Sequence, residues 1–465
     1  MCRIERGKAA LRTSHQMQRN LMLAPIDHPI AKELEAVSRI LDSEPTLAEL
    51  VAQDLVPAGK RCDRGAPGMT GNQALRAAVV KQMNGYSYAQ LTFHLADSAT
   101  YQRFCGFGLA ESPPGRSTLA ENIKRIRPQT WEAINRTLAH VAQDVGIESG
   151  ERARMDCTVV LAPILSPTDG GLLWDTVRVV SRTLVRAMEL CPKLQFGDPS
   201  KKAKRCAYDV FYARSAEKRR PHYDALIQIA IETLEGAQAS LPTLRESKTK
   251  AKPNGRRVRK LAKLLATLER HIPLGWQVVE QTFDRVVQET PVPAAEKVVS
   301  IFEEHTDIIV KDRRETLFGH KICLNVGPSS FVTDCQILDG NPADSTLVEN
   351  MLQRHREIHG AAPKQAAFDG GFASKANVAI ARAQGVTDIC FSKKRGIDIA
   401  DMASSHAVYR TLKRFRAGVE GCISFLKRSF GMDRCTWKSE SSFASYVWLS
   451  VVACNLLVLA RHILD

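Results

Sequence analysis

The order of elements predicted along the chain indicates a mixed α/β protein. We expect a sheet-based core, a large helical insertion within it, and an all-α N-terminal domain. Runs of β-branched residues bounded by turn signals begin near residue 152, whereas helical periodicity dominates residues 70–150. A second helical block separates the first predicted strand from the later ones. Apolar residues make up 44% and charged residues 25% of the chain, which excludes wholesale disorder.

The N-terminal part divides into two segments. Residues 1–69 are poorly patterned and are interpreted as an extension and linker, with the linker between Pro57 and Pro67. Residues 70–150 contain short helical segments with Gly-containing connections, and Asp97 or Ser98 can cap the third helix. This pattern predicts a helix-turn-helix-like DNA-binding domain, although a small all-α packing domain shows the same pattern.

Residues 151–445 are predicted to form the sheet domain. A strand near residue 155 is followed by a hairpin around residues 327–330, a helix over 345–358 and a strand ending at Asp369. A helix over 374–384, a strand over 386–391 and helices from about 405 complete the order, which is that of a ribonuclease-H-like mixed sheet. The helical insertion covers about residues 180–312. Residues 446–465 are expected to form a buried helix of the same domain, because their apolar run is too short for a membrane span.

Net charge and cysteine usage indicate the partner and the compartment. The formal charge of +15 favours a polyanion, and residues 245–270 hold ten Lys or Arg against two acids. A basic protein with solvated lysines is the alternative. The twelve cysteines are dispersed and form no C-x-x-C pair, so they predict neither a secreted disulfide framework nor a zinc ribbon and fit a reducing cytoplasm.

Three carboxylates fall where such a sheet would bring them together: Asp156 in the first strand, Asp369 after the fourth and Glu420 on the late helix. Mg²⁺ prefers oxygen ligands, and two such ions can activate an attacking oxygen and stabilise a leaving one. Each acid alone is weak evidence. Asp156 could be a solvated strand residue, Asp369 could belong to an Asp-Gly turn, and Glu420 could be a surface residue.

The helix around Glu420 is more informative. Arg416, Glu420 and Lys427 are separated by four and seven residues, which places them within about 40° on one helix face. Cations on both sides of a carboxylate suit phosphate-backbone contacts, whereas a solvated ion pair plus an unrelated Lys is the simpler alternative. Gly418 and Gly421 indicate close approach of another group to this helix.

These segments resemble the DDE transposases of bacterial insertion sequences, in particular the ISNCY-type group. The segments that carry the resemblance, from about residue 70 to the C-terminus, are MDCTVVLAPILSPTDGGLLWDTVRVVSR, FGHKICLNV, DGNPADS, AFDGGFAS and the stretch that begins FRAGVEGCISFLKRSFG. The resemblance implies that Asp156, Asp369 and Glu420 are the catalytic metal ligands, holding two Mg²⁺ ions with Mn²⁺ as a substitute. It also implies that Arg416 and Lys427 contact DNA. Lys413 stands where relatives have Tyr, and it could replace that contact as a point charge.

The activity implied is metal-dependent cleavage at the element ends, followed by strand transfer into target DNA. The partner implied is double-stranded DNA, both the terminal inverted repeats and the target. We expect at least a homodimer, because two ends must be held, and a cytoplasmic, nucleoid-associated location in a bacterium. A non-cleaving DNA-binding relative and a metal-dependent nuclease without strand transfer are the alternatives. A tyrosine recombinase built on Tyr409 has the least support, because its nucleophile needs an Arg/His cluster.

Overall fold

The computed structural model describes residues 26–56, 68–108, 111–252, 255–311 and 315–465. The chain forms two compact units: unit 1 combines Met1–Pro163 with Gly319–Asp465, and unit 2 comprises Ile164–Phe318. The predicted linker over 57–67 lies outside the described residues. Because Ile164–Phe318 lies between the two segments of unit 1, unit 2 is an insertion in the sequence of unit 1. The domain boundaries predicted at residues 69, 150 and 445 stay predictions.

Helices make up the N-terminal part of unit 1. They are α2 (Pro29–Ser43), α3 (Pro45–Leu55), α4 (Gly71–Met83), α5 (Tyr88–Asp97), α6 (Ala99–Cys105), α7 (Arg116–Arg125) and α8 (Pro128–Asp144). Helices α4 and α5 both start with reciprocal capping boxes, and Ser98 rather than Asp97 caps α6. Residues 29–55 were expected to belong to a poorly patterned extension. The structure differs there because Leu34, Val37 and Leu41 form a buried helical stripe in α2.

Unit 1 also holds a mixed sheet. Its strands are β1 (Arg152–Leu161), β3 (Glu315–Val326), β4 (Val332–Ile337), β5 (Gln365–Phe368) and β6 (Asp388–Phe391). They lie in the order β4-β3-β1-β5-β6. The β1–β3 and β3–β4 pairs are antiparallel, whereas the β1–β5 and β5–β6 pairs are parallel. The hairpin expected around residues 327–330 is confirmed as the β3–β4 connection.

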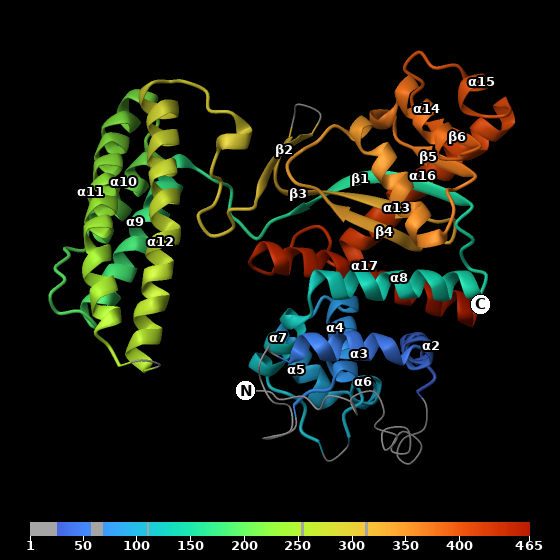
Figure 1. Cartoon of the computed structure of the whole chain (residues 1–465), viewed down its shortest axis with the longest axis horizontal. Helices are drawn as coiled ribbons and strands as arrows, with labels where there is room; N and C mark the ends of the chain where they lie inside the picture. The colour runs from blue at the N-terminus through green and yellow to red at the C-terminus, as the bar shows by residue number, and fades with distance from the viewer. Residues whose placement is uncertain (1–25, 57–67, 109–110, 253–254, 312–314) are drawn as a thin grey trace. The chain divides into compact units, whose positions relative to one another are not determined.

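Helices cover the sheet (Figure 1). They are α13 (Val348–His359), α14 (Lys375–Ala383), α15 (Ile399–Met402), α16 (His406–Ser429) and α17 (Glu440–Leu464). Ala153 and Met155 of β1 share a core cluster with residues of α13 and α14. Helix α16 packs against β1, β5 and β6. Because β1 side chains alternate, Arg154 and Asp156 project from the strand face opposite Ala153 and Met155.

The C-terminal helix α17 packs against β4 and against the N-terminal helices α2, α4 and α8. Of the described helices, α17 alone is long and apolar enough to span a membrane, and its most apolar 18-residue window has a mean hydropathy of 2.0. However, 83% of its most apolar window is buried inside the protein. The helix therefore serves as a core element between the N-terminal helices and the sheet.

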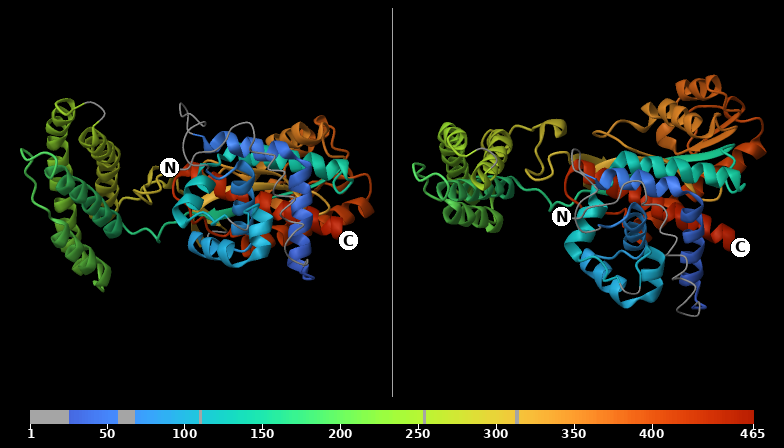
Figure 2. Two further views of the ribbon diagram at one scale, coloured as in Figure 1. Left: turned by 90° about the horizontal axis from the view of Figure 1, so that it is seen from below. Right: turned by 60° about the horizontal axis from the view of Figure 1, so that its bottom comes forward.

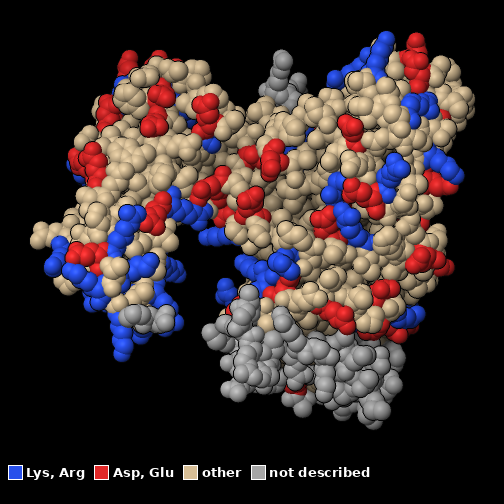
Figure 3. Space-filling view, viewed as in Figure 1, with Lys and Arg blue, Asp and Glu red and all other residues tan. Residues whose placement is uncertain are grey.

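Unit 2 is built around a helical bundle, visible in both views of Figure 2. Its helices are α9 (Asp169–Met188), α10 (Ser200–Tyr212), α11 (Ala216–Thr249) and α12 (Arg256–Thr282), which share one apolar core. Lys and Arg gather where α11 ends and α12 begins, on the face shown in Figure 3. The helical insertion was expected to extend to about residue 312, which is wrong at its end, because β2 (Asp307–Lys311) pairs with β3.

Candidate active site

The first carboxylate, Asp156, lies in β1. Its Oδ1 accepts the Cys157 backbone N–H at 2.8 Å, and its Oδ2 lies 3.7 Å from Arg416 Nη1. The side chain is 17% exposed. Burial, and secondarily the negative charge of Asp369, raises the pKa of Asp156 to about 6, although the Cys157 N–H and Arg416 favour the charged form. The hydrogen bond from Cys157 and the charge of Arg416 therefore only partly stabilise the ionised form of Asp156.

The second carboxylate, Asp369, directly follows β5 and precedes the short helix η4 (Gly370–Phe372). Its Oδ1 accepts the Ser392 hydroxyl at 2.7 Å and lies 3.3 Å from Arg416 Nη1. Burial is the largest influence and would raise its pKa. The Ser392 and Gly370 hydrogen bonds, together with Arg416 and Lys393, outweigh it and hold the pKa of Asp369 below its ordinary value. Asp369 is therefore the more readily ionised of the two aspartates.

The third carboxylate, Glu420, lies on α16. Ser405 caps the start of this helix, and Val419, Cys422 and Leu426 anchor its second half in the core. Glu420 is 65% exposed, and its Oε1 accepts a hydrogen bond from Arg416 Nη2 at 2.7 Å, one helical turn away. Burial would lower the pKa of Arg416, but the three carboxylates around it raise that pKa above its ordinary value.

Arg416 is thus the point on which all three predicted acids converge. A single guanidinium, 14% exposed, contacts Asp156, Asp369 and Glu420 at 3.7, 3.3 and 2.7 Å. These residues come from a central strand, the end of the neighbouring parallel strand and a helix packed on both. The structure therefore assembles the predicted triad around one predicted cation.

The other predicted cations of α16 have different surroundings. Lys427 lies 3.9 Å from Asp433, beyond the end of the helix, and Lys413 is exposed one turn before Arg416. Tyr409, which a tyrosine recombinase would need as nucleophile, is 4% exposed, and its hydroxyl donates to the Phe391 carbonyl oxygen at 2.8 Å. Because that hydroxyl is buried and bonded, Tyr409 has a structural role.

Arg154, which no pattern in the sequence singled out, connects β1 to α16. Its guanidinium donates to the Phe415 carbonyl oxygen and to Ser330 Oγ, and it lies over the Phe415 ring. A Cβ at Gly418 would meet Arg154 Nη1 at 2.0 Å, so the predicted close approach is correct there. At Gly421 a Cβ would meet nothing within 4 Å, and the prediction is wrong for that residue.

A fourth acid, Asp344, lies at the start of η3 (Asp344–Thr346) and was not predicted as a site residue. Its Oδ1 lies 2.5 Å from Nζ of Lys321, and its charge contributes to the raised pKa of Asp156. A Cβ at Gly371 would meet Asp344 Oδ2 at 2.5 Å. The DGNPADS segment was a signal for this residue, but spacing alone did not separate it from other acids.

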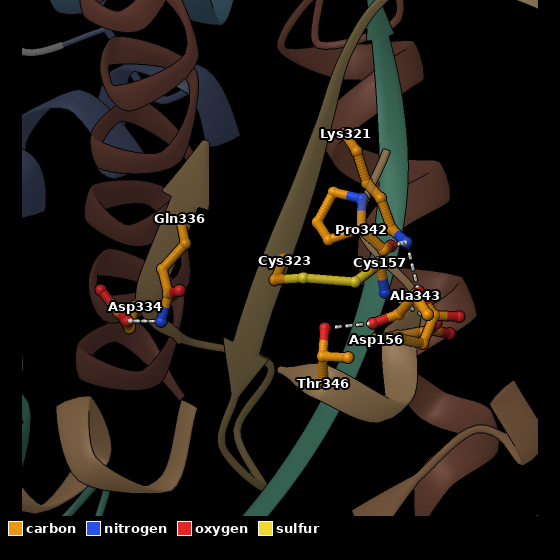
Figure 4. The surroundings of a disulfide bond; sticks show 10 residues. Asp156, Cys157, Lys321, Cys323, Asp334, Gln336, Pro342, Ala343 and Thr346 are labelled. Carbon is orange, nitrogen blue, oxygen red and sulfur yellow. Dashed lines mark hydrogen bonds and ion pairs between the residues drawn. A yellow bond between two sulfur atoms is a disulfide. The ribbon is translucent and has the colours of Figure 1, made fainter. Parts of the chain in front are cut away.

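A disulfide lies beside the first carboxylate. Cys157 and Cys323 face each other across β1 and β3, joined with Cα atoms 4.3 Å apart, and Asp156 is the adjacent residue (Figure 4). The dispersed cysteines predicted no such bond. The difference arises because 166 residues separate the two along the chain and only the strand register brings them together.

Carboxylate oxygens are the ligands that hard divalent cations prefer, so the donor chemistry of this site fits Mg²⁺. Among the residues that the structure describes, however, no group of three His, Cys, Asp or Glu side chains is close enough to hold one ion. Arg416 occupies the space between the acids. Because Arg416 contacts both aspartates as well as Glu420, all three acids would have to exchange Arg416 for the ion.

An acidic centre on a mixed sheet, in a chain with a charge of +15, defines a carboxylate site suited to chemistry on polyanions. Two family comparisons specify the class further: a transposase domain matches residues 24–125, and a transposase DDE domain matches residues 289–456. The chain belongs to the DDE transposases of insertion sequences, which confirms the resemblance at family level. No curated protein and no solved structure matches the chain.

The matched ranges bear on the earlier predictions in two ways. The first match starts at residue 24, so it includes α2 and α3, which were assigned to the extension. The second match starts after the helical bundle of unit 2 and contains Asp369, Arg416 and Glu420 but not Asp156. The ISNCY-type grouping stays a prediction.

Proposed function

We propose that this transposase cleaves DNA at the ends of its insertion sequence and joins the freed ends to target DNA. The observation that carries the proposal is the contact of Asp156, Asp369 and Glu420 with the single guanidinium of Arg416. The strand order β4-β3-β1-β5-β6, with antiparallel and then parallel pairs, supports a ribonuclease-H-like core. Unit 2 is its helical insertion, and residues 70–150 are its helix-turn-helix-like DNA-binding domain.

Asp156, Asp369 and Glu420 are the proposed ligands of two Mg²⁺ ions, for which Mn²⁺ can substitute. When bound, such ions supply activation of the attacking oxygen and stabilisation of the leaving oxygen. The chain positions its carboxylates for this task. The Cys157 N–H orients Asp156, and the Ser392 hydroxyl orients Asp369.

Arg416, Lys413 and Lys427 are the proposed phosphate contacts along α16. The three acids engage the charge of Arg416, and a cation held by these acids would leave that charge for a DNA phosphate. Lys413 and Lys427 lie N-terminal and C-terminal to Glu420 on the same helix, so they can contact the backbone on either side of a scissile bond. Because two element ends must be held together, we propose a homodimer or higher assembly in the bacterial cytoplasm.

The test uses purified full-length protein and labelled linear DNA that carries its own coding sequence with the flanking DNA on both sides. Supercoiled plasmid serves as the target, with Mg²⁺ or EDTA present. We expect Mg²⁺-dependent cleavage on both sides of the coding sequence and joining to the plasmid. Glu420→Gln should abolish both reactions, whereas Glu357→Gln, an exposed carboxylate on α13, should retain them.

Three results would contradict the proposal. Binding without cleavage in both Mg²⁺ and Mn²⁺ would identify a DNA-binding relative of transposases. Cleavage without joining would identify a nuclease. Retention of full activity in Glu420→Gln would remove Glu420 from the site.

A further inference from the structure

Helix α10 of unit 2 presents an unusual outer surface. Tyr208, Phe211 and Tyr212 are 61%, 71% and 62% exposed, although large apolar side chains of bundle helices normally face the core. The opposite side of the helix fulfils that role, since Ala203 and Val210 are buried in the core of the bundle. The three rings are therefore not needed to attach α10 to its neighbours.

The rings form a cluster of their own. The Tyr208 and Tyr212 ring centroids are 4.3 Å apart, and those of Phe211 and Tyr212 are 5.0 Å apart with the rings nearly perpendicular. A contiguous exposed apolar surface of this kind usually marks a binding site, because contact of apolar side chains with water is unfavourable in free energy.

Cations share this surface with the rings. At 100° per residue, Lys201, Lys204 and Arg205 lie with the three aromatic residues inside an arc of about 120°, and all three cations are exposed. The only acid in the sequence of α10 is Asp209, which lies beside the arc and faces His222 at 3.8 Å. We call the surface formed by residues 201, 204, 205, 208, 211 and 212 the aromatic-basic face.

We propose that the aromatic-basic face binds DNA through unpaired bases. Exposed rings stack on the flat faces of bases, and in a duplex neighbouring base pairs already cover those faces. The cations match the phosphates of the same strand, whereas a purely apolar protein partner would gain nothing from them. The inference rests on the proposed function in that DNA is the substrate. Beyond the proposed function, the inference states that the enzyme binds a DNA segment with unstacked bases, and that unit 2 provides the binding surface.

The experiment measures affinity of the full-length chain for a fluorescent oligothymidylate and for a labelled duplex of the element end. The triple variant Tyr208→Ala/Phe211→Ala/Tyr212→Ala removes the rings, and the double variant Tyr208→Phe/Tyr212→Phe keeps them. One ring stacked on one base is worth about five- to 150-fold in affinity. We expect the triple variant to lose at least about tenfold for oligothymidylate, with duplex binding and the double variant within about twofold of wild type.

Fold and assembly are checked in the same samples. The substituted side chains are exposed, so circular dichroism and the melting temperature should not change. Wild-type affinity for oligothymidylate in a correctly folded triple variant would overturn the inference. A triple variant that keeps this affinity but changes oligomeric state would identify the face as a contact between copies of the chain. Failure of the wild type to bind the element-end duplex would instead contradict the proposed function.

Discussion

Replacing Asp156 by Asn should stabilise the metal-free protein at neutral pH. The carboxylate is largely buried and lies near Asp369, and these two influences outweigh the Cys157 N–H and Arg416, so that the pKa of Asp156 rises from 3.8 to about 6. The ionised folded state is then less favourable than the ionised unfolded state. A neutral amide of the same size avoids this cost and can still accept the Cys157 N–H.

The magnitude and the pH window follow from these values. A pKa raised from 3.8 to about 6 corresponds to about 3 kcal/mol of lost stability above pH 6. Between these two pH values the folded state binds a proton that the unfolded state does not, so the cost falls as the pH is lowered. Below pH 3.8 both states are protonated and the cost is absent. Because the raised pKa already includes the attraction to Arg416, we expect a gain of up to about 3 kcal/mol for the variant at neutral pH.

The assay is calorimetric melting in EDTA across this pH range, for wild type, Asp156→Asn and Asp144→Asn. Asp144 is an exposed carboxylate at the end of α8 and serves as the control. The gain should amount to several degrees at neutral pH, should shrink towards pH 4, and should not appear in the control. A destabilised or pH-independent Asp156→Asn variant would refute the electrostatic account of the site.

Three further predictions concern contacts around the site and in the N-terminal helices. Arg416→Gln should lower the melting temperature in EDTA, because three carboxylates lose their shared cation. Added Mg²⁺ should raise the melting temperature of this variant more than that of wild type, and an equal rise in both proteins would contradict the prediction. Gly418→Ala should cost about 1 kcal/mol in a denaturation experiment, because its Cβ would meet Arg154 Nη1 at 2.0 Å and displace it from the Phe415 carbonyl oxygen, a loss that the higher helix propensity of Ala only partly offsets. Arg76→Met should cost about 1–3 kcal/mol because the Phe104 carbonyl oxygen loses its buried donor, and unchanged melting would show that the contacts of Arg76 are not stabilising.

The sheet and the triad were predictable from sequence because their signals are local. The β-branched run of β1 and the turn between β3 and β4 each lie within a few residues, and the β5–α14–β6 unit is a continuous segment over 365–391. Their order was enough to suggest which strands are neighbours, and hence where Asp156 and Asp369 would meet. Arg416 and Glu420 were predictable because four residues along a helix place two side chains on one face.

Contacts between distant segments could not be predicted in this way. Cys157 and Cys323 oppose each other only through the register of β1 and β3. The segment after β4 brings Asp344 close enough to Asp156 to raise its pKa. Lys321, in the middle of β3, forms an ion pair with Asp344. Periodicity alone also cannot separate the end of a helical block from a short strand such as β2, because both are apolar.

The arrangement of the triad depends on one contact that its motif does not contain. Arg154 lies two residues before Asp156, so both side chains leave β1 on the same side. Its guanidinium reaches the Phe415 carbonyl oxygen and occupies the space that a side chain at Gly418 would need. The strand that carries the first carboxylate therefore also fixes the helix that carries the third. A slip of α16 by one turn would move Arg416 and Glu420 together by about 5.4 Å, and Arg416 would lose its contacts with Asp156 and Asp369. Gly418 thus leaves room for the Arg154 guanidinium two residues before Glu420, rather than making the helix flexible.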